Sequence, residues 1–206
     1  TLLTLIISAC ATVSNSDVIL LDSKPINAKN TKIVENQLNE TPIDIWERIR
    51  RELTIKIPND QIAATSIYRE RLYKNQSAVN RISKSGQRYL FHTLSRAQEL
   101  DLPVELALLP FVESEFDPYA KSVDGATGIW QFMPATGKEW GLKSNWWYDG
   151  KKDVLASTEA ALKFLSYLHP KFDEDWLLAM AAYNTGPSRV NRAIRKNKMQ
   201  DKGIRF

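Results

Sequence analysis

The sequence predicts an all-α protein, mainly helical, with at most a small β-hairpin. Three observations indicate this class. From residue 41 onward, apolar side chains recur at helical spacing in successive segments, each bounded by a proline, a glycine or a capping acid. No convincing run of alternating apolar and polar residues, the pattern of a half-buried strand, interrupts them. With 43% hydrophobic and 25% charged residues, the 206 residues suit one ordinary globular domain with appendages.

The first half of the helical part predicts several helices in succession. One begins near Thr41, where Pro42 suits the first turn and the carboxylate of Asp44 suits the third helical position. Others are predicted over residues 61–74 and 78–85. The helix after these carries an apolar stripe that repeats every three or four residues: Leu90, Leu94, Ala97 and Leu100.

A proline interrupts the next helix, which opens at Pro103. Pro110 has no N–H to donate to residue 106, so we expect a break or a kink there. Residues 118–152 then hold several glycines, and they predict loops with one short helix near residues 134–139. These loops also contain an aromatic cluster: Trp146, Trp147 and Tyr148.

The last part of the chain predicts three more helices. Asp153 can cap a helix over Val154–Leu168, which Pro170 stops. Residues 175–186 are apolar almost all round, and this predicts a buried helix. A final helix is expected over residues 187–196.

The first 40 residues predict a lipid-anchored end and a tether. Residues 1–10 hold an apolar run too short to span a bilayer, and they end in "ISAC", which resembles the lipobox of bacterial lipoproteins. Cys10 would then carry the lipid; the alternative is a buried free thiol. Ala11 favours the outer membrane by the sorting rules of such lipoproteins. Residues 11–40 are mostly polar and predict a flexible tether, which leaves 41–206 for the folded domain.

Several kinds of site find little support in the sequence. The net charge is +4 with scattered basic residues, so we expect no nucleic-acid binding, although "RAIRKNKMQDK" near the C-terminus is basic. His92 and His169 lie on different predicted helices, and with one cysteine no metal site is expected. Ser114 lacks the Gly-x-Ser-x-Gly context of a nucleophile. No glycine-rich phosphate loop occurs, and we expect no cofactor.

Carboxylate chemistry is left, and Glu113 is the candidate. It directly follows a run of large apolar residues, "LLPFV". Burial there would raise its pKa and keep it protonated, as a general acid requires, whereas the alternative is an exposed glutamate at a helix end. We expect Glu115 to face solvent. Asp117 and Asp149 precede a proline and a glycine, and both are expected in turns.

Two downstream segments could complete a site around Glu113. In "GATGIWQFMPATG" (125–137), glycines let backbone approach a ligand, and the amide of Gln131 could bond a hydroxyl or N-acetyl group. In "AAYNTG" (181–186), Tyr183 could hydrogen-bond the Glu113 carboxyl, or it could be a core tyrosine. Three aromatic rings could stack on sugars or fill the core instead: Trp130, Tyr119 and Tyr183.

Together these motifs resemble a known family. "ES" at 113–114, "GIWQFMP" at 128–134 and "AAYNTG" at 181–186 match, in order and spacing, the motifs of lytic transglycosylases with a goose-type lysozyme fold. Within that family the chain resembles the membrane-bound lytic murein transglycosylase D group, over roughly residues 41–200. "ELALLPFVESEFDPYA", "NWWYDGKKDV" and "DWLLAMAAYNTG" carry this similarity. It implies a lysozyme-like fold and cleavage of the β-1,4 bond between MurNAc and GlcNAc with formation of 1,6-anhydromuramic acid ends.

Carried over residue by residue, the resemblance places the single catalytic acid on Glu113. It also implies positions that line the site or contact saccharide: Ser122, Gln131, Met133, Tyr183 and Asn184. Trp130 stands where the wider family mostly has methionine, which is a feature of the resembled group. The partner implied is the peptidoglycan glycan strand, acted on by a monomer. The anchor on Cys10 would hold it at the periplasmic face of the outer membrane; the alternative is a free periplasmic protein.

The sequence departs from the resembled group in one respect, and two other functions are also compatible with it. The group usually carries C-terminal LysM modules, which do not occur before Phe206, and we expect the sequence to be a fragment or the product of a truncated gene. A lysozyme-like hydrolase would need a second carboxylate or a positioned water. A non-catalytic peptidoglycan-binding lipoprotein would need neither.

Overall fold

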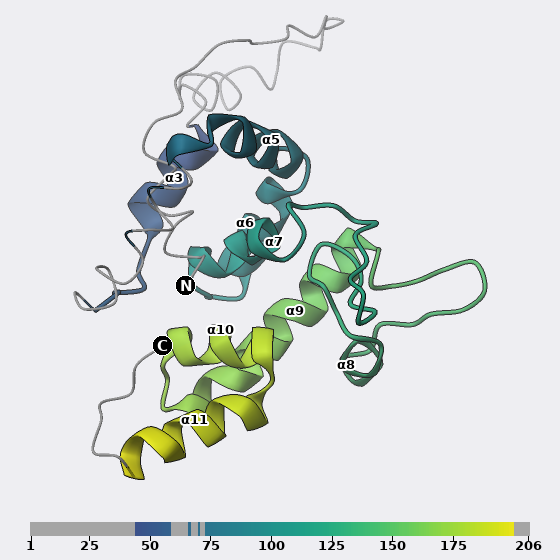
Figure 1. Cartoon of the computed structure of the whole chain (residues 1–206). Helices are drawn as coiled ribbons and strands as arrows, with labels where there is room; N and C mark the ends of the chain where they lie inside the picture. The colour runs from purple at the N-terminus through teal and green to yellow at the C-terminus, as the bar shows by residue number, and fades with distance from the viewer. Residues whose placement is uncertain (1–43, 59–65, 67–69, 71–72, 200–206) are drawn as a thin grey trace, which may run out of the picture.

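A computed structural model describes residues 44–58, 66, 70 and 73–199 (Figure 1). Within these ranges the regular structure is helical, and β-structure is limited to isolated bridges, so the predicted all-α class is confirmed. No helix in the described ranges is long and apolar enough to cross a membrane. The predicted anchor at Cys10, the tether over 11–40 and most of the helix over 61–74 lie outside them.

The first described helices follow the apolar pattern of the sequence. α3 (Ile45–Glu52) begins later than predicted, because Asp44 is its N-cap rather than a residue of its first turn. The Asp44 carboxylate accepts a hydrogen bond from Trp46 N at 3.1 Å, which satisfies one of the free N–H groups at the helix start. α5 (Gln76–Gly86) and α6 (Leu90–Glu99) lie close to where they were predicted. Three residues of the predicted stripe are buried, Leu90, Leu94 and Ala97, whereas the fourth, Leu100, is half-buried at the C-cap of α6.

The break expected at Pro110 is present. The chain runs as a 3-10 helix, η1 (Val104–Leu108), and then as the short helix α7 (Leu109–Glu113), with Pro110 in its first turn. Directly after α7, Glu115 (φ 52°) and Phe116 (φ 61°) both adopt left-handed backbone angles. Such angles cost non-glycine residues energy, and here they turn the chain sharply as soon as α7 ends.

The later helices agree closely with the sequence signals. Asp153 and Asp175 each cap a helix by accepting hydrogen bonds from two N–H groups of its first turn. The helix predicted near 134–139 and the helix predicted over 154–168 have the expected bounds. The elements in this part are α8 (Pro134–Glu139), α9 (Val154–Leu168), η2 (His169–Phe172), α10 (Trp176–Thr185) and α11 (Pro187–Met199).

The long helix α9 lies at the centre of the described part (Figure 1). α10 packs against α9, η2 and α11, while α6 packs against α9 and η1 from the other side. The core between them includes fully buried side chains from α6, η1, α9 and α10: Leu94, Leu106, Leu108, Leu162, Leu165 and Ala179. This packing brings the end of α7 next to the end of α10.

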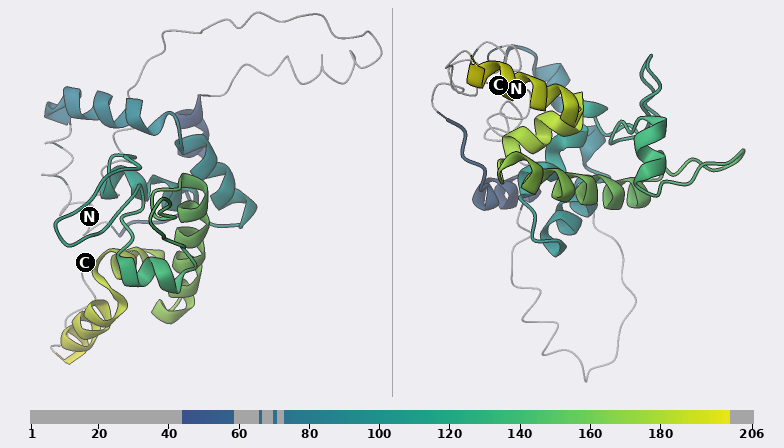
Figure 2. Two further views of the ribbon diagram at one scale, coloured as in Figure 1. Left: turned by 90° about the vertical axis from the view of Figure 1, so that its right-hand side faces the viewer. Right: turned by 90° about the horizontal axis from the view of Figure 1, so that it is seen from below.

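Two long loops flank α8 (Figure 2). The loop between α7 and α8 carries the glycine-rich motif, and the loop between α8 and α9 projects from the body. The two loops touch at Gly128, where a Cβ atom would lie 1.8 Å from the carbonyl oxygen of Lys151. With a φ of 83° as well, Gly128 is a position that only glycine fits.

Candidate active site

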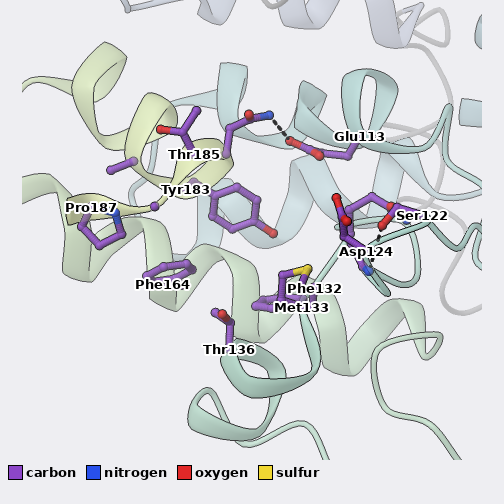
Figure 3. A pocket seen from close by; sticks show the side chains of 15 residues that line it. Glu113, Ser122, Asp124, Phe132, Met133, Thr136, Phe164, Tyr183, Thr185 and Pro187 are labelled. Carbon is purple, nitrogen blue, oxygen red and sulfur yellow. Dashed lines mark hydrogen bonds between the residues drawn. The ribbon is translucent and has the colours of Figure 1, made fainter. Parts of the chain in front are cut away.

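A pocket of about 440 Å³ opens between the end of α7, the loop before α8 and the end of α10 (Figure 3). Its size is that of an ordinary small-ligand site. All the side chains that the resemblance placed at the site line this one pocket: Glu113, Ser122, Gln131, Met133, Tyr183 and Asn184. Residues far apart in the sequence therefore meet where the motifs predicted.

The carboxyl group of Glu113 is half-buried at the end of α7. Burial raises its pKa above the ordinary value of 4.5, as the apolar run before it predicted. A hydrogen bond of 2.9 Å from Asn184 Nδ2 to Glu113 Oε1 opposes this effect and lowers the pKa. Burial is the larger of the two, so the protonated form is favoured relative to a carboxyl in water.

Of the two alternatives for Tyr183, the hydrogen bond to Glu113 is contradicted by the structure. The Tyr183 hydroxyl donates instead to the carbonyl oxygen of Trp130, at 2.8 Å. Burial, and next the charge of Glu113, raise the pKa of Tyr183 well above its ordinary value of 10, so the phenol keeps its proton. Tyr183 therefore fixes the glycine-rich loop, and Asn184 is the residue that bonds the acid.

The structure selects the core alternative for Trp130. Its ring is fully buried, and Nε1 donates to Thr158 Oγ1 at 3.0 Å, so this ring does not stack on a sugar. The side-chain amide of Gln131 also serves the loop, because Nε2 donates to the carbonyl oxygens of Gly128 at 2.8 Å and Ala120 at 3.3 Å. What Gln131 can offer a ligand is its acceptor oxygen.

The remaining predicted positions keep polar or exposed atoms at the pocket. Ser122 Oγ accepts a hydrogen bond from Ala126 N at 3.0 Å, so its own proton can be donated to a ligand. Met133 is 42% exposed and points its sulfur into the space that Glu113 and Tyr183 share (Figure 3). Tyr119, considered for stacking, is exposed and does not line this pocket.

Sequence reasoning missed one acid of the site, Asp124. It is exposed and lines the pocket together with Glu113 (Figure 3). An aspartate before a glycine reads as a turn residue, and nothing in its neighbours distinguishes it from Asp149. The pocket also takes residues that no motif singled out: Thr136, Phe164, Thr185 and Pro187.

The other acids and Ser114 have structural roles. Glu115 accepts hydrogen bonds from Arg81 at 2.8 and 2.9 Å on the surface, as its predicted solvent exposure allows. Asp117 accepts from Tyr119 N and Asp149 from Lys151 N, which confirms both predicted turns. Ser114 Oγ donates to the carbonyl oxygen of Ile129 at 2.9 Å and so joins α7 to the glycine-rich loop. These assignments leave Glu113 and Asp124 as the carboxyl groups of the pocket.

Comparison with known proteins identifies similar sequences. Residues 91–206 match the family described as "Transglycosylase SLT domain". The chain is 42% identical, over 79% of its length, to the membrane-bound lytic murein transglycosylase D of Escherichia coli K12. It is 30% identical, over 49% of its length, to the soluble lytic murein transglycosylase of Salmonella typhimurium.

A solved structure is also similar, the X-ray structure of an inactive mutant of the lytic transglycosylase Slt from Pseudomonas aeruginosa. It matches 51% of this chain and 17% of its own, with 27% identity and a TM-score of 0.40. The chain spans 36% of the E. coli relative and 16% of the Salmonella one. The family match covers more than half of the chain and includes every residue of the pocket. The protein belongs to the Transglycosylase SLT domain family.

Proposed function

We propose that this protein is a lytic transglycosylase that cleaves the β-1,4 bond between MurNAc and GlcNAc in peptidoglycan strands. The observation that carries the proposal is Glu113, a half-buried carboxyl with a raised pKa that opens onto the pocket. A group of this kind holds a proton until a reaction takes it. The names of the relatives, lytic murein transglycosylases, support the substrate and the reaction class.

The proposed reaction uses Glu113 twice. The protonated carboxyl first donates its proton to the bridging oxygen, so the bond from this oxygen to the muramyl C1 breaks and the GlcNAc hydroxyl leaves. The substrate's own acetamido group stabilises the positive charge at C1. The carboxylate of Glu113 then removes the proton from the muramyl C6 hydroxyl, whose oxygen bonds to C1. The product is a 1,6-anhydromuramyl end, no water is consumed, and Glu113 is protonated again.

The neighbours of Glu113 suit both steps. The Asn184 amide can stabilise the carboxylate that forms after the first proton transfer, because its hydrogen bond lowers the pKa of that group. The proton of Ser122, the acceptor oxygen of Gln131 and the exposed thioether of Met133 offer mixed contacts for hydroxyl, acetamido and C–H groups of a saccharide. Substrate binding is the role proposed for them.

The test is Glu113→Gln with Glu115→Gln as its matched control. Each variant removes one acid, and the two side chains lie two residues apart, but Glu115 pairs with Arg81 on the surface. On purified sacculi, Glu113→Gln should release no soluble muropeptides while still sedimenting with the wall, and Glu115→Gln should release them. Products should carry anhydro ends by mass spectrometry. Soluble products from Glu113→Gln would contradict the assignment, and binding without products from the parent protein would favour a non-catalytic wall-binding role.

A lysozyme-like hydrolase is the second candidate, and Asp124 is the observation that favours it. Hydrolysis with two carboxyl groups needs a base or nucleophile besides the acid, and Asp124 lines the same pocket. The hydrolysed product is heavier than the anhydro product by one water. Products with the added water, lost in Asp124→Asn, would favour the hydrolase.

We further propose that the protein is anchored through a lipid on Cys10 to the periplasmic face of the outer membrane. The sequence "ISAC" supports this location, as does the E. coli relative, which is named membrane-bound. The natural precursor gene should give protein that fractionates with the outer membrane, and Cys10→Ala should move it to the soluble periplasmic fraction. An unchanged distribution would remove the anchor from the proposal.

A further inference from the structure

The loop between α8 and α9 exposes two neighbouring tryptophans. Trp146 is 94% exposed and Trp147 is 70% exposed. The loop leaves the body and returns to it in Figure 1 and in the right-hand view of Figure 2, so its tip is a projection of the chain. Tryptophan has a large apolar surface, and two such rings in water are unfavourable unless a ligand covers them.

Residues 143–150, called the tryptophan arm below, are held rigid by their own hydrogen bonds. Asn145 Oδ1 accepts from Trp147 N at 3.1 Å and Tyr148 N at 2.8 Å, and Asn145 N donates to the Tyr148 carbonyl at 2.7 Å. Gly150 N donates to the Lys143 carbonyl at 2.8 Å and closes the base. The backbone that carries the rings is therefore held in place, which lowers the entropy lost when a ligand binds.

The base of the arm is attached to the wall of the pocket. Lys151 is 9% exposed, and its ammonium group donates to Asp149 Oδ1 at 2.7 Å. The carbonyl of Lys151 packs directly on Gly128 of the glycine-rich loop. Gln131 and Met133, which line the pocket, follow on that same loop. The base of the arm thus packs against the loop that lines the pocket.

We propose that the tryptophan arm is a second glycan-binding site, which stacks Trp146 and Trp147 on sugar rings of the strand outside the pocket. The proposal rests on the proposed function, because it takes its ligand class from it. A pocket of about 440 Å³ encloses a short piece of a saccharide, so a long strand must continue over the surface. The C–H face of a pyranose is apolar and similar in size to an indole ring, and each exposed ring can cover one.

The dimensions of the arm argue against a stable protein partner. Such an interface covers about 800 Å² on each partner, whereas two tryptophan side chains supply about 500 Å² at most. A membrane is also a poor ligand for the arm, because inserting the rings into a bilayer would bury the polar residues beside them. Ser144 and Asn145 precede Trp146 directly, and both are exposed. Discrete rings on a polar support suit a chain of separate sugar rings.

The test compares binding of long and short ligands by the full 206-residue chain. Glu113→Gln serves as the background, so that binding is measured without turnover. The ligands are purified peptidoglycan strands and a MurNAc–GlcNAc tetrasaccharide, titrated with tryptophan fluorescence and calorimetry as readouts. In Trp146→Ala/Trp147→Ala, we expect the affinity ratio of long to short ligand to fall about tenfold or more, because two aromatic contacts are lost.

Two further variants separate stacking from unfolding of the loop. Phe91→Ala removes a 63% exposed aromatic ring from α6 and should leave the affinity ratio unchanged. Asn145→Ala keeps both tryptophans but removes the acceptor for Trp147 N and Tyr148 N, and it should lower the ratio by a smaller factor. Trp146→Tyr should restore most of the ratio in a protein that also has Trp147.

Several outcomes would overturn the proposal. An unchanged ratio in the double alanine variant, or an equal loss for both ligands, would show that the arm is no separate glycan site. As a further measurement, each protein is sedimented with phospholipid vesicles. If the double alanine variant no longer sediments with them but still binds glycan strands like the parent, the arm binds a membrane and not a glycan. The proposed function fails on another result, the absence of cleavage products from the parent protein, which the binding ratio does not affect.

Discussion

Asn184 Nδ2 donates a hydrogen bond of 2.9 Å to Glu113 Oε1 and so connects two residues that are 71 positions apart in the sequence. Among the described residues, no other hydrogen bond to this carboxyl is found. The amide carries no charge, and it stabilises the ionised form of an acid whose protonated form burial favours. One side chain therefore tunes how readily Glu113 releases its proton.

Removing this amide should shift the pH dependence of the reaction. In Asn184→Ala, burial acts unopposed, so the pKa of Glu113 rises further. A general acid must be protonated in the free enzyme, so the rate falls as pH rises through its pKa. The alkaline limb of kcat/KM should therefore move to higher pH, measured with a soluble muropeptide substrate. Asn184→Asp should move it further, because a second carboxylate disfavours ionisation; an unmoved limb in both variants would remove Asn184 from this role.

Glu113 should also make the protein less stable as pH rises. Because its pKa is raised in the folded state, its contribution to stability is fully present below the ordinary value of 4.5 and is lost as pH rises through the folded value. Glu113→Gln has no charge to bury, so it should be more stable than the parent at pH 7.5. The difference should disappear near pH 3.5. Urea unfolding at both pH values measures it, and a constant difference would contradict the raised pKa.

The helices were predictable because their signals are local. Asp153 needs only the next three residues to cap α9, and Pro110 needs only its missing N–H to end a helical stretch. The start of α3 was predicted too early, because Thr41 and Pro42 also have the chemistry of a helix start, whereas Asp44 is the N-cap. Local chemistry thus predicts that an element exists better than it predicts its first residue.

The site was predictable only in part, because its contacts depend on packing between distant elements. The motifs correctly gathered Glu113 and Asn184 into one pocket. They did not reveal that the Tyr183 hydroxyl donates to the Trp130 carbonyl oxygen. A phenol close to both an acid and a loop carbonyl can donate its hydrogen bond to either of them. Asp124 carries no sequence signal at all, because its position at the pocket follows from the path of the loop. Partners within hydrogen-bond reach are a property of the fold.

Gly128 should be the least replaceable glycine of the site. Gly128→Ala would place Cβ 1.8 Å from the Lys151 carbonyl oxygen, which neither backbone can avoid without moving. Gly141 is the matched control, since its φ of 82° is nearly the same as the 83° of Gly128 but a Cβ there meets nothing within 4 Å. We expect Gly141→Ala to cost about 1–2 kcal/mol, the price of a left-handed alanine.

The Gly128→Ala variant should cost more than that, by about 2 kcal/mol or more, because overpacking adds to the strain. It should also lose activity, since the glycine-rich loop carries Gln131 and Met133 into the pocket. Thermal unfolding and muropeptide release measure the two effects. Equal stability of the two variants would contradict the prediction, because it would mean that the loops carrying Gly128 and Lys151 can move apart without loss of stability.

Arg96 of α6 and Glu159 of α9 form an ion pair, and we expect its contribution to stability to be lost at acidic pH. Arg96 Nε lies 2.6 Å from Glu159 Oε2, and Arg96 Nη2 lies 3.1 Å from Glu159 Oε1. The hydrogen bonds from Arg96 are the main reason that the pKa of Glu159 is lowered to about 2. Because this pKa is lowered, the pair stabilises the fold above the ordinary value of 4.5, and the contribution is lost as pH falls through about 2.

Glu159→Gln should therefore destabilise the protein at neutral pH and much less in acid. The side chains of Arg96 and Glu159 are 30% and 33% exposed, so solvent screens the pair and the loss of stability should be modest. Lys163→Gln is the control, because Lys163 also reaches Glu159, at 3.0 Å, but leaves the Arg96 contacts in place. Its loss should be smaller. Urea unfolding of the three proteins between pH 2 and pH 7 measures both effects, and parallel curves for Glu159→Gln and the parent would show that the pair contributes nothing.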